Sequence, residues 1–174
     1  MDQVGSLTLS DKAEVLFYLD IYHGKKFANI RKFIRSEKYT GPTKSGVKLN
    51  KDVFKKVQEA LQDVPSSLSE AEEKELALVL VSRIVSIRVS ISYYQGKYGI
   101  DIREYYKTPN YKGPGKSGVR IPYEFLGQMR AFLEQMSVGL GISKEGNTVI
   151  PPQEVREECD NNPEGVPNDY RKFF

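Results

Sequence analysis

The sequence Tyr39-Thr-Gly-Pro-Thr-Lys-Ser-Gly-Val47 returns 72 residues later as Tyr111-Lys-Gly-Pro-Gly-Lys-Ser-Gly-Val119. The same offset, without a gap, also pairs Gly24 with Gly96 and residues 30–31 with residues 102–103. Chance does not keep register over so long a stretch, so the sequence predicts two copies of one structural unit.

Each copy begins with the alternating pattern of a half-buried strand. In the second copy, apolar side chains occupy every other position from Val85 to Tyr93, and Ser or Arg stands between them. In the first copy, Val15, Phe17, Leu19 and Ile21 hold the matching apolar positions. We expect a turn at Gly24 and Gly96, a second strand at about 27–35 and 99–107, a Gly-Pro turn, and a short last strand at 47–49 and 119–121.

The apolar period then becomes helical in both copies. Apolar residues from Val53 to Leu61 predict a helix over 51–63, and those from Phe125 to Leu133 predict one over 122–136. Because each apolar stripe needs a partner, we expect the two helices to pack together about a pseudo-two-fold axis.

These patterns divide the chain into four parts. Residues 13–64 and 85–136 are the two strand-and-helix repeats. Residues 65–84 form a connector, in which Ser69-Glu-Ala-Glu72 resembles a capping box that opens a short acidic helix. Residues 137–174 are acidic and rich in Gly and Pro, which predicts a tail without regular structure that could fold back over basic sheets.

Charge is unevenly distributed along the chain. The net charge is +3, yet residues 13–64 carry +5 and residues 85–136 carry +4, whereas residues 65–84 carry −2 and residues 137–174 carry −3. Two basic blocks in acidic surroundings favour a polyanionic ligand.

The second copy is similar to the positive cofactor 4 family of transcriptional coactivators. The resemblance rests on residues 94–106, Tyr-Gln-Gly-Lys-Tyr-Gly-Ile-Asp-Ile-Arg-Glu-Tyr-Tyr, on Gly113–Val119 and on the helix that follows. The first copy resembles a divergent member. The resemblance implies an α+β fold with two repeats of a four-stranded antiparallel sheet followed by a helix, paired as an intramolecular pseudo-dimer whose curved sheets grip single-stranded DNA. PUR-repeat and Whirly proteins have related architectures.

Single strands are bound by cations that follow the phosphates and by aromatic faces that stack on bases. Both copies supply such residues at matching positions, and Tyr106 stands where the family has an aromatic at the binding ridge, with Ile34 as its counterpart. The candidate nucleic-acid-binding residues are Tyr22, Lys25, Arg31, Lys44 and Lys48 in the first copy and Tyr94, Lys97, Arg103, Tyr106, Lys116 and Arg120 in the second.

Each candidate also has a structural interpretation. The cations could form an ordinary solvated surface, Tyr22 and Tyr94 could pack at strand ends, and Arg31 and Arg103 could brace the Gly-Pro turn.

Catalysis has little support in the sequence. Gly113-Pro-Gly-Lys-Ser117 resembles a phosphate loop, but position 110 is Asn110 where the motif needs glycine, and a strand follows where it needs a helix. His23 has Gln95 as its counterpart, and Cys159 lies in the predicted tail. With one histidine and one cysteine the chain lacks ligands for a Cys/His zinc site. We therefore expect no enzyme activity, no cofactor and no metal.

The expected function is sequence-tolerant binding of single-stranded DNA, or of RNA, in transcription, replication or recombination. Transcription or replication proteins are further expected partners, and the chain would act as a monomeric pseudo-dimer or a higher homo-oligomer. The alternative is a protein-interaction module whose basic sheets dock acidic partners. The absence of a signal segment and of a long apolar run predicts a soluble intracellular protein, cytoplasmic, nucleoid or nuclear, with no membrane partner.

Overall fold

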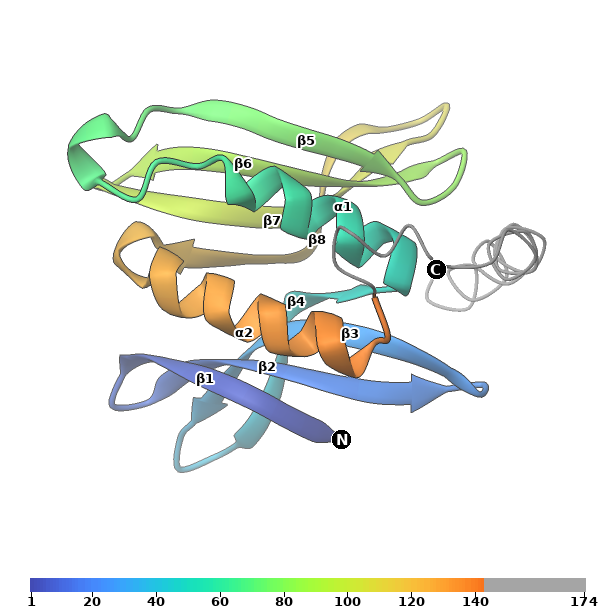
Figure 1. Ribbon diagram of the computed structural model, residues 1–174, viewed down its shortest axis with the longest axis horizontal. Helices are drawn as coiled ribbons and strands as arrows, with labels where there is room; N and C mark the ends of the chain where they lie inside the picture. The colour runs from blue at the N-terminus through green and yellow to red at the C-terminus, as the bar shows by residue number, and fades with distance from the viewer. Residues whose placement is uncertain (143–174) are drawn as a thin grey trace.

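The computed structural model describes residues 1–142, which form two four-stranded antiparallel sheets and two helices (Figure 1). The first unit comprises β1 (Asp2–Ser10), β2 (Ala13–Tyr22), β3 (Lys25–Arg35), β4 (Thr40–Leu49) and α1 (Lys51–Gln62). The second comprises β5 (Lys74–Leu80), β6 (Val85–Tyr94), β7 (Lys97–Lys107), β8 (Lys112–Pro122) and α2 (Leu126–Gly139), with short 3₁₀ helices at Leu68–Glu70 and Tyr123–Phe125. The predicted fold class is confirmed.

The first strand of each sheet lies outside the predicted repeats. β1 precedes residue 13, and β5 lies within residues 65–84, where a connector with an acidic helix was expected. Only Leu68–Glu70 is helical there. Residues 74–80 form a strand because pairing with β6 satisfies the hydrogen-bonding groups on one side of the β5 backbone and buries Val79. A longer helix does not form because residues 69–72 have no apolar stripe to pack against the core.

The Gly-Pro segments are strands instead of the predicted turns. Pro42 pairs with Phe33 on β3, and Pro114 pairs with Tyr105 on β7. Proline is tolerated there because β4 and β8 are the last strands of their sheets, where one side of the backbone has no ladder to maintain. The chain instead reverses at residues 36–39 and 108–111, where the Ser36 and Thr108 hydroxyls bond to the backbone.

The two units exchange helices across the molecule. α1 contacts β5 of the second sheet more extensively than any strand of its own sheet, and α2 lies against β1 and β2 of the first. On α2 the Phe132 ring lies 5.2 Å from the Phe17 ring, and a Cβ at Gly5 would come within 2.4 Å of Phe132. Glycine at position 5 therefore allows the close approach of helix and sheet.

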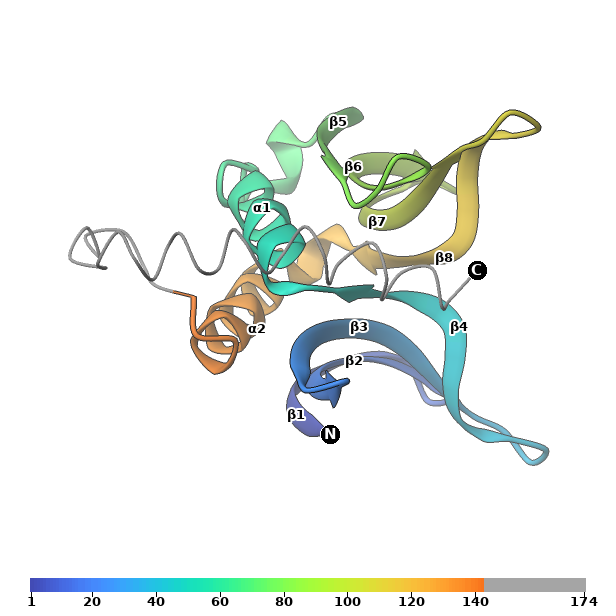
Figure 2. The ribbon, with the colours of Figure 1, turned by 90° about the vertical axis from the view of Figure 1, so that its right-hand side faces the viewer.

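The helices also contact each other, as predicted. Arg130 on α2 donates hydrogen bonds to the Leu61 carbonyl at the end of α1, at 2.7 and 3.0 Å, and to the Val64 carbonyl. Figure 2 shows both helices on one side, β4 and β8 adjacent in the centre, and the β3–β4 and β7–β8 hairpins diverging on the other side. One apolar core runs through both units, which pair within the chain.

The helix boundaries differ slightly from the predicted ones. α1 begins at Lys51, where the Asn50 side chain accepts a bond from the Val53 amide at 2.9 Å. α2 ends at Gly139, past the predicted start of the acidic tail at 137. Nearly all of that tail, 143–174, lies outside the described residues.

Candidate nucleic-acid interface

A two-residue hairpin turn places an aromatic opposite a lysine in each unit. His23 and Gly24 have φ values of 51° and 78°, and Gln95 and Gly96 have 51° and 79°. Positive φ at both central residues is typical of the type I′ turn that matches strand twist. The turns make Tyr22 and Lys25, and likewise Tyr94 and Lys97, cross-strand neighbours.

A cation from the last strand of each sheet lies over the tyrosine. Lys48 Nζ is 4.5 Å from the centroid of the Tyr22 ring, and Arg120 Cζ is 5.9 Å from that of Tyr94. The Arg120 guanidinium is fixed by hydrogen bonds to the Ser92 hydroxyl at 2.7 Å and to the Lys97 carbonyl at 2.8 Å. A tyrosine ring can stack on a base while the cation beside it neutralises the phosphate of that nucleotide.

The two tyrosines differ in accessibility. Tyr94 is 63% exposed, so its ring is available to a ligand. Tyr22 is half-buried and packs against Phe27, with ring centroids 6.4 Å apart. The strand-end packing that the sequence left open for both tyrosines therefore applies to Tyr22.

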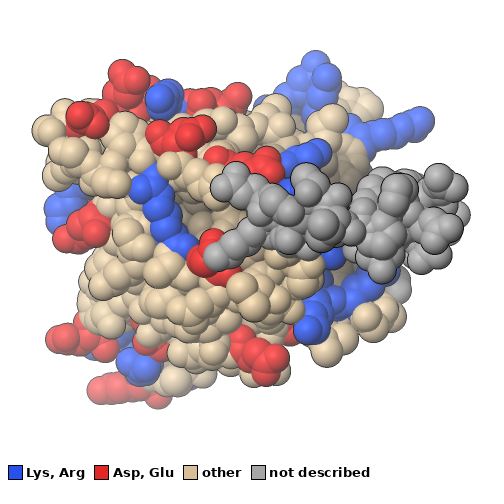
Figure 3. Space-filling model, viewed as in Figure 1, with Lys and Arg blue, Asp and Glu red and all other residues tan. Residues whose placement is uncertain are grey.

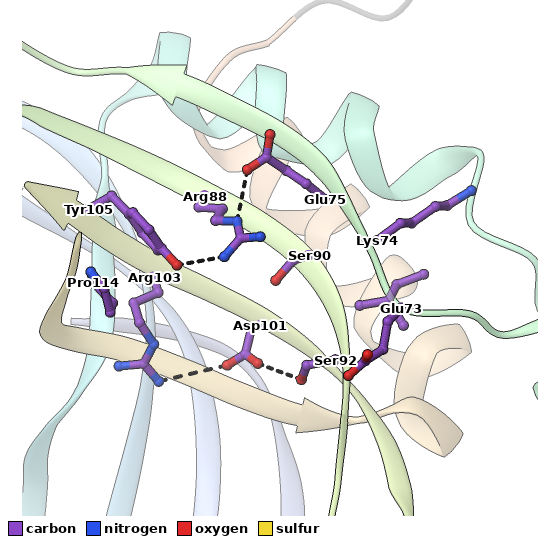
Figure 4. A pocket seen from close by; sticks show the side chains of 11 residues that line it. Glu73, Lys74, Glu75, Arg88, Ser90, Ser92, Asp101, Arg103, Tyr105 and Pro114 are labelled. Atoms are coloured by element: carbon purple, nitrogen blue, oxygen red, sulfur yellow. Dashed lines mark hydrogen bonds and ion pairs between the residues drawn. The ribbon is translucent and has the colours of Figure 1, made fainter. Parts of the chain in front are cut away.

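A polar cleft of about 460 Å³ lies on the outer face of the second sheet. Figure 4 shows Arg88 between Glu75 and Tyr105, and Asp101 between Arg103 and Ser92. The distances are 2.8 Å from Arg88 Nε to Glu75 Oε1, 2.5 Å from Arg88 Nη1 to the Tyr105 hydroxyl, 2.7 Å from the Ser92 hydroxyl to Asp101 Oδ2, and 3.7 Å from Arg103 Nη2 to Asp101 Oδ1.

The cleft combines cations with acceptors. Partial burial lowers the pKa of the Arg88 guanidinium, but its hydrogen bonds and charge interactions with Tyr105 and Glu75 raise this pKa overall. Arg88 therefore stays protonated. Fixed guanidinium groups suit phosphate or base edges, whereas the carboxylate of Glu75 opposes a polyanion.

The equivalent face of the first sheet is closed by its own side chains. Positions 88, 90 and 101 of the cleft correspond to Leu16, Tyr18 and Asn29, which are all buried. The Tyr18 and Phe33 rings meet edge to face with centroids 6.2 Å apart. The two half-sites therefore differ, one being polar and open and the other aromatic and packed.

Arg31 and Arg103 brace the hairpins, which is the alternative that the sequence left open. Arg31 Nη1 donates to the Thr43 carbonyl at 3.0 Å, and Arg103 Nη1 donates to the Gly115 carbonyl at 3.4 Å. Arg103 also lines the cleft, so it has both a bracing contact and an accessible position.

The remaining candidate lysines are exposed. Lys25 and Lys97 begin β3 and β7, and Lys44 and Lys116 lie on the hairpin arms of β4 and β8. Figure 3 shows Lys and Arg gathered at the right-hand end of the molecule and acidic side chains at the upper left. On this face of the molecule, positive charge is thus concentrated at one end.

The structure separates Tyr106 from the other candidates. Tyr106 pairs with Val85 and packs against the core, on the face of β7 opposite Arg103 and Tyr105. Its hydroxyl donates to Glu104 Oε1 at 3.0 Å, and burial together with the charge of Glu104 raises the pKa of Tyr106 to about 12. Strand alternation places the Tyr106 side chain on the inner face of β7, and its role at a binding ridge stays a prediction.

Sequence reasoning named Arg103 and missed the other residues that line the cleft. Arg88 has Leu16 as its counterpart, so the recurrence of cations did not reveal it, and Glu75 lies on a strand that was not predicted. The alternation of Arg88 with Val85–Ile91 did place it on the outer face. This alternation was the sequence signal that could have revealed Arg88.

Two classes of site find no support in the described part of the chain. Within residues 1–142 no three His, Cys, Asp or Glu side chains are grouped to hold a metal ion. No helix in this range combines the length and apolarity needed to span a membrane.

Comparison with known proteins finds similarity in the second unit. Residues 85–132 match the model of the family described as Transcriptional Coactivator p15 (PC4). Two crystal structures of a PC4 homolog from Burkholderia pseudomallei, orthorhombic and tetragonal, are each 28% identical over 38% of this chain, covering 90% and 98% of theirs, with a TM-score of 0.34. No curated protein matches significantly. The family match confirms the resemblance that residues 94–106 and 113–119 indicated.

Proposed function

We propose that this chain, whose second unit carries a PC4 family domain, binds single-stranded DNA on the outer faces of its two sheets. The observation that carries the proposal is the recurrence of one arrangement: a tyrosine before a type I′ turn, a lysine across from it, and a cation over the ring. The family match favours transcription among the processes that such binding serves.

Binding would use two kinds of contact. The exposed Tyr94 ring would stack on a base, which is sequence-tolerant because every base has a π-face. Arg120, Lys97 and the cleft cations would neutralise phosphates, and this term weakens with salt. If about five phosphates are neutralised, affinity falls about a hundredfold between 50 and 200 mM salt.

The second sheet would be the primary half-site. Its cleft is open and holds Arg88 and Arg103, whereas the matching face of the first sheet is filled by Leu16, Tyr18 and Phe33. Lys25, Lys44 and Lys48 of the first unit would then extend the phosphate track within the same chain.

The proposed role is binding without chemistry. The ionisable groups of the cleft are engaged with one another, as Arg88 is with Glu75 and Arg103 is with Asp101, and this arrangement favours recognition over proton transfer. The proposed binding requires no nucleophile beside a general base, which is the arrangement that covalent catalysis needs.

The experiment is fluorescence polarisation with labelled single-stranded DNA, duplex DNA and RNA of one length and matched sequence, with heparin as competitor. We expect the single-stranded DNA to bind most tightly and heparin to compete less well than unlabelled single strand, because heparin has charge and no bases. Equal binding of duplex and single strand, or heparin competing as well as the single strand, would contradict the proposal.

A further inference from the structure

The first strand of the second sheet leaves an apolar edge uncovered. β5 is the outermost strand and has one neighbour, β6. Leu78 and Leu80, which stand opposite Arg88 and Ser86 on the outer face, are 52% and 75% exposed. Ile84, in the loop that follows, is 42% exposed. Large apolar side chains on an open edge are an unusual feature, because natural edge strands are commonly blunted by charge, proline or bulges.

The backbone amide and carbonyl groups of Leu78 and Leu80 also point away from the sheet. The amide of Val81, one residue past the end of β5, donates to the Val85 carbonyl at 3.0 Å and so points towards β6. Because successive residues of a strand present their backbone groups to opposite sides, the amides and carbonyls of Leu78 and Leu80 point away from β6. The edge therefore offers both apolar surface and unpaired backbone groups to another strand.

β1, the matching strand of the first unit, has no leucines at these positions. At the same repeat offset, Leu78 and Leu80 correspond to Ser6 and Thr8 on β1. Both strands have a register shift near their start, between Gln3 and Gly5 on β1 and between Glu75 and Ala77 on β5, and both are regular over the four residues that follow. Strand geometry alone therefore does not account for the leucines.

We propose that the β5 edge binds the β5 edge of a second copy of this chain, antiparallel about a two-fold axis at Val79. This register places Leu78 opposite Leu80 of the other copy, both with outward-facing backbone groups. Four leucines would then form one cluster on the outer face, and two sheets would join into one of eight strands.

Charge complementarity supports a second copy as the occupant. An antiparallel arrangement brings Arg83, which follows β5, close to the start of the other β5, where Glu73 and Glu75 lie. The two-fold axis repeats this contact, so basic and acidic groups meet at both ends of the leucine cluster. The assembly goes beyond the proposed function and needs no nucleic acid.

Sedimentation analysis of the full chain without nucleic acid, from about 1 to about 100 μM, tests the proposal. We expect the apparent mass to rise towards that of two chains. The double variant Leu78→Ser/Leu80→Thr, which gives β5 the side chains of β1, should weaken association at least tenfold. The matched control Ser6→Ala/Thr8→Ala on β1 should associate as the wild type does.

Cross-linking tests the register independently. In a Cys159→Ser background, Leu78→Cys protein mixed with Leu80→Cys protein should form a disulfide faster than either alone, because paired residues lie about 5.5 Å apart between Cα atoms and a disulfide spans this distance. A wild-type chain that stays monomeric, a double variant that associates unchanged, or equal cross-linking in all samples would overturn the proposal. Circular dichroism shows whether the variants are folded, and if the double variant is unfolded, the cross-linking of the cysteine pair decides between the two outcomes.

Discussion

The guanidinium of Arg120 lies over the exposed ring of Tyr94, with Cζ 5.9 Å from the ring centroid. The first unit places Lys48 over Tyr22 in the same way at 4.5 Å. Only Tyr94 leaves most of its ring open to a ligand, so this pair is the centre of the proposed interface.

Replacing Tyr94 should weaken binding. Stacking on an aromatic is worth about 1–3 kcal/mol, so Tyr94→Ala should lower affinity for single-stranded DNA about tenfold. The salt dependence should stay the same because no charge is lost. Tyr93→Ala is the matched control: Tyr93 is 51% exposed and precedes Tyr94 on the same strand, but its side chain lies on the opposite face against Tyr98. Equal losses in both variants, measured by fluorescence polarisation, would remove Tyr94 from the interface.

Removing a carboxylate from the cleft should strengthen binding. Glu75→Gln supplies the residue that the first unit has at this position, Gln3, and leaves Arg88 without its acidic partner. We expect affinity to rise about twofold to fivefold, with little change in stability because the Glu75 side chain is 48% exposed. The control is Glu72→Gln, which removes an exposed acid outside the residues that line the cleft. A weaker complex with Glu75→Gln would mean that Glu75 holds Arg88 in its binding position.

The exchanged helices should make the chain unfold as one body. Phe132 on α2 packs against Phe17 in the first sheet, so Phe132→Ala should lower the free energy of unfolding by about 2 kcal/mol, less than a fully buried ring would cost. Val138→Ala, on the exposed side of α2, should cost less than about 0.5 kcal/mol. Denaturant unfolding followed by circular dichroism and tyrosine fluorescence should give one coincident transition. Two separate transitions would show that the units fold independently.

The raised pKa of Tyr106 sets a limit on stability at alkaline pH. Burial and the charge of Glu104 raise this pKa to about 12, above its value of about 10 in the unfolded chain, so the folded state favours the neutral phenol. The stabilisation is fully present below about pH 10 and is lost as pH rises through about 12. Titration of phenolate absorbance should show a group ionising near pH 12 that Tyr106→Phe removes. An unchanged titration curve would place Tyr106 in solvent.

Repeats and local periodicity predicted much of this fold, and the differences have physical causes. Val85–Tyr93 gave a clear strand because its inner face is apolar and its outer face polar. β1 and β5 escaped prediction because their outer residues are Ser6 and Thr8 in one and Leu78 and Leu80 in the other, so no shared pattern marks them. The helix exchange also left no local signal, since an apolar stripe does not specify which sheet it will cover.

Part of the geometry of the candidate site could be expected from the sequence. Recurrence identified Tyr22, Tyr94 and the cations beside them, because both units keep the same turn. It could not identify Arg88, which has no basic counterpart. Recurrence reveals what the two units share, and it cannot reveal the residues that make them different.

The most direct test of the central claim is to compare binding of a single-stranded DNA oligomer with binding of an abasic oligomer of the same length and charge. If exposed Tyr94 stacks on bases while Arg120 and Lys97 hold phosphates, the abasic strand should bind about tenfold or more weakly, with the same dependence on salt. Tyr94→Ala should then reduce affinity for the base-containing strand only. Equal affinity for the two strands would contradict the account, because the sheets would then recognise charge alone.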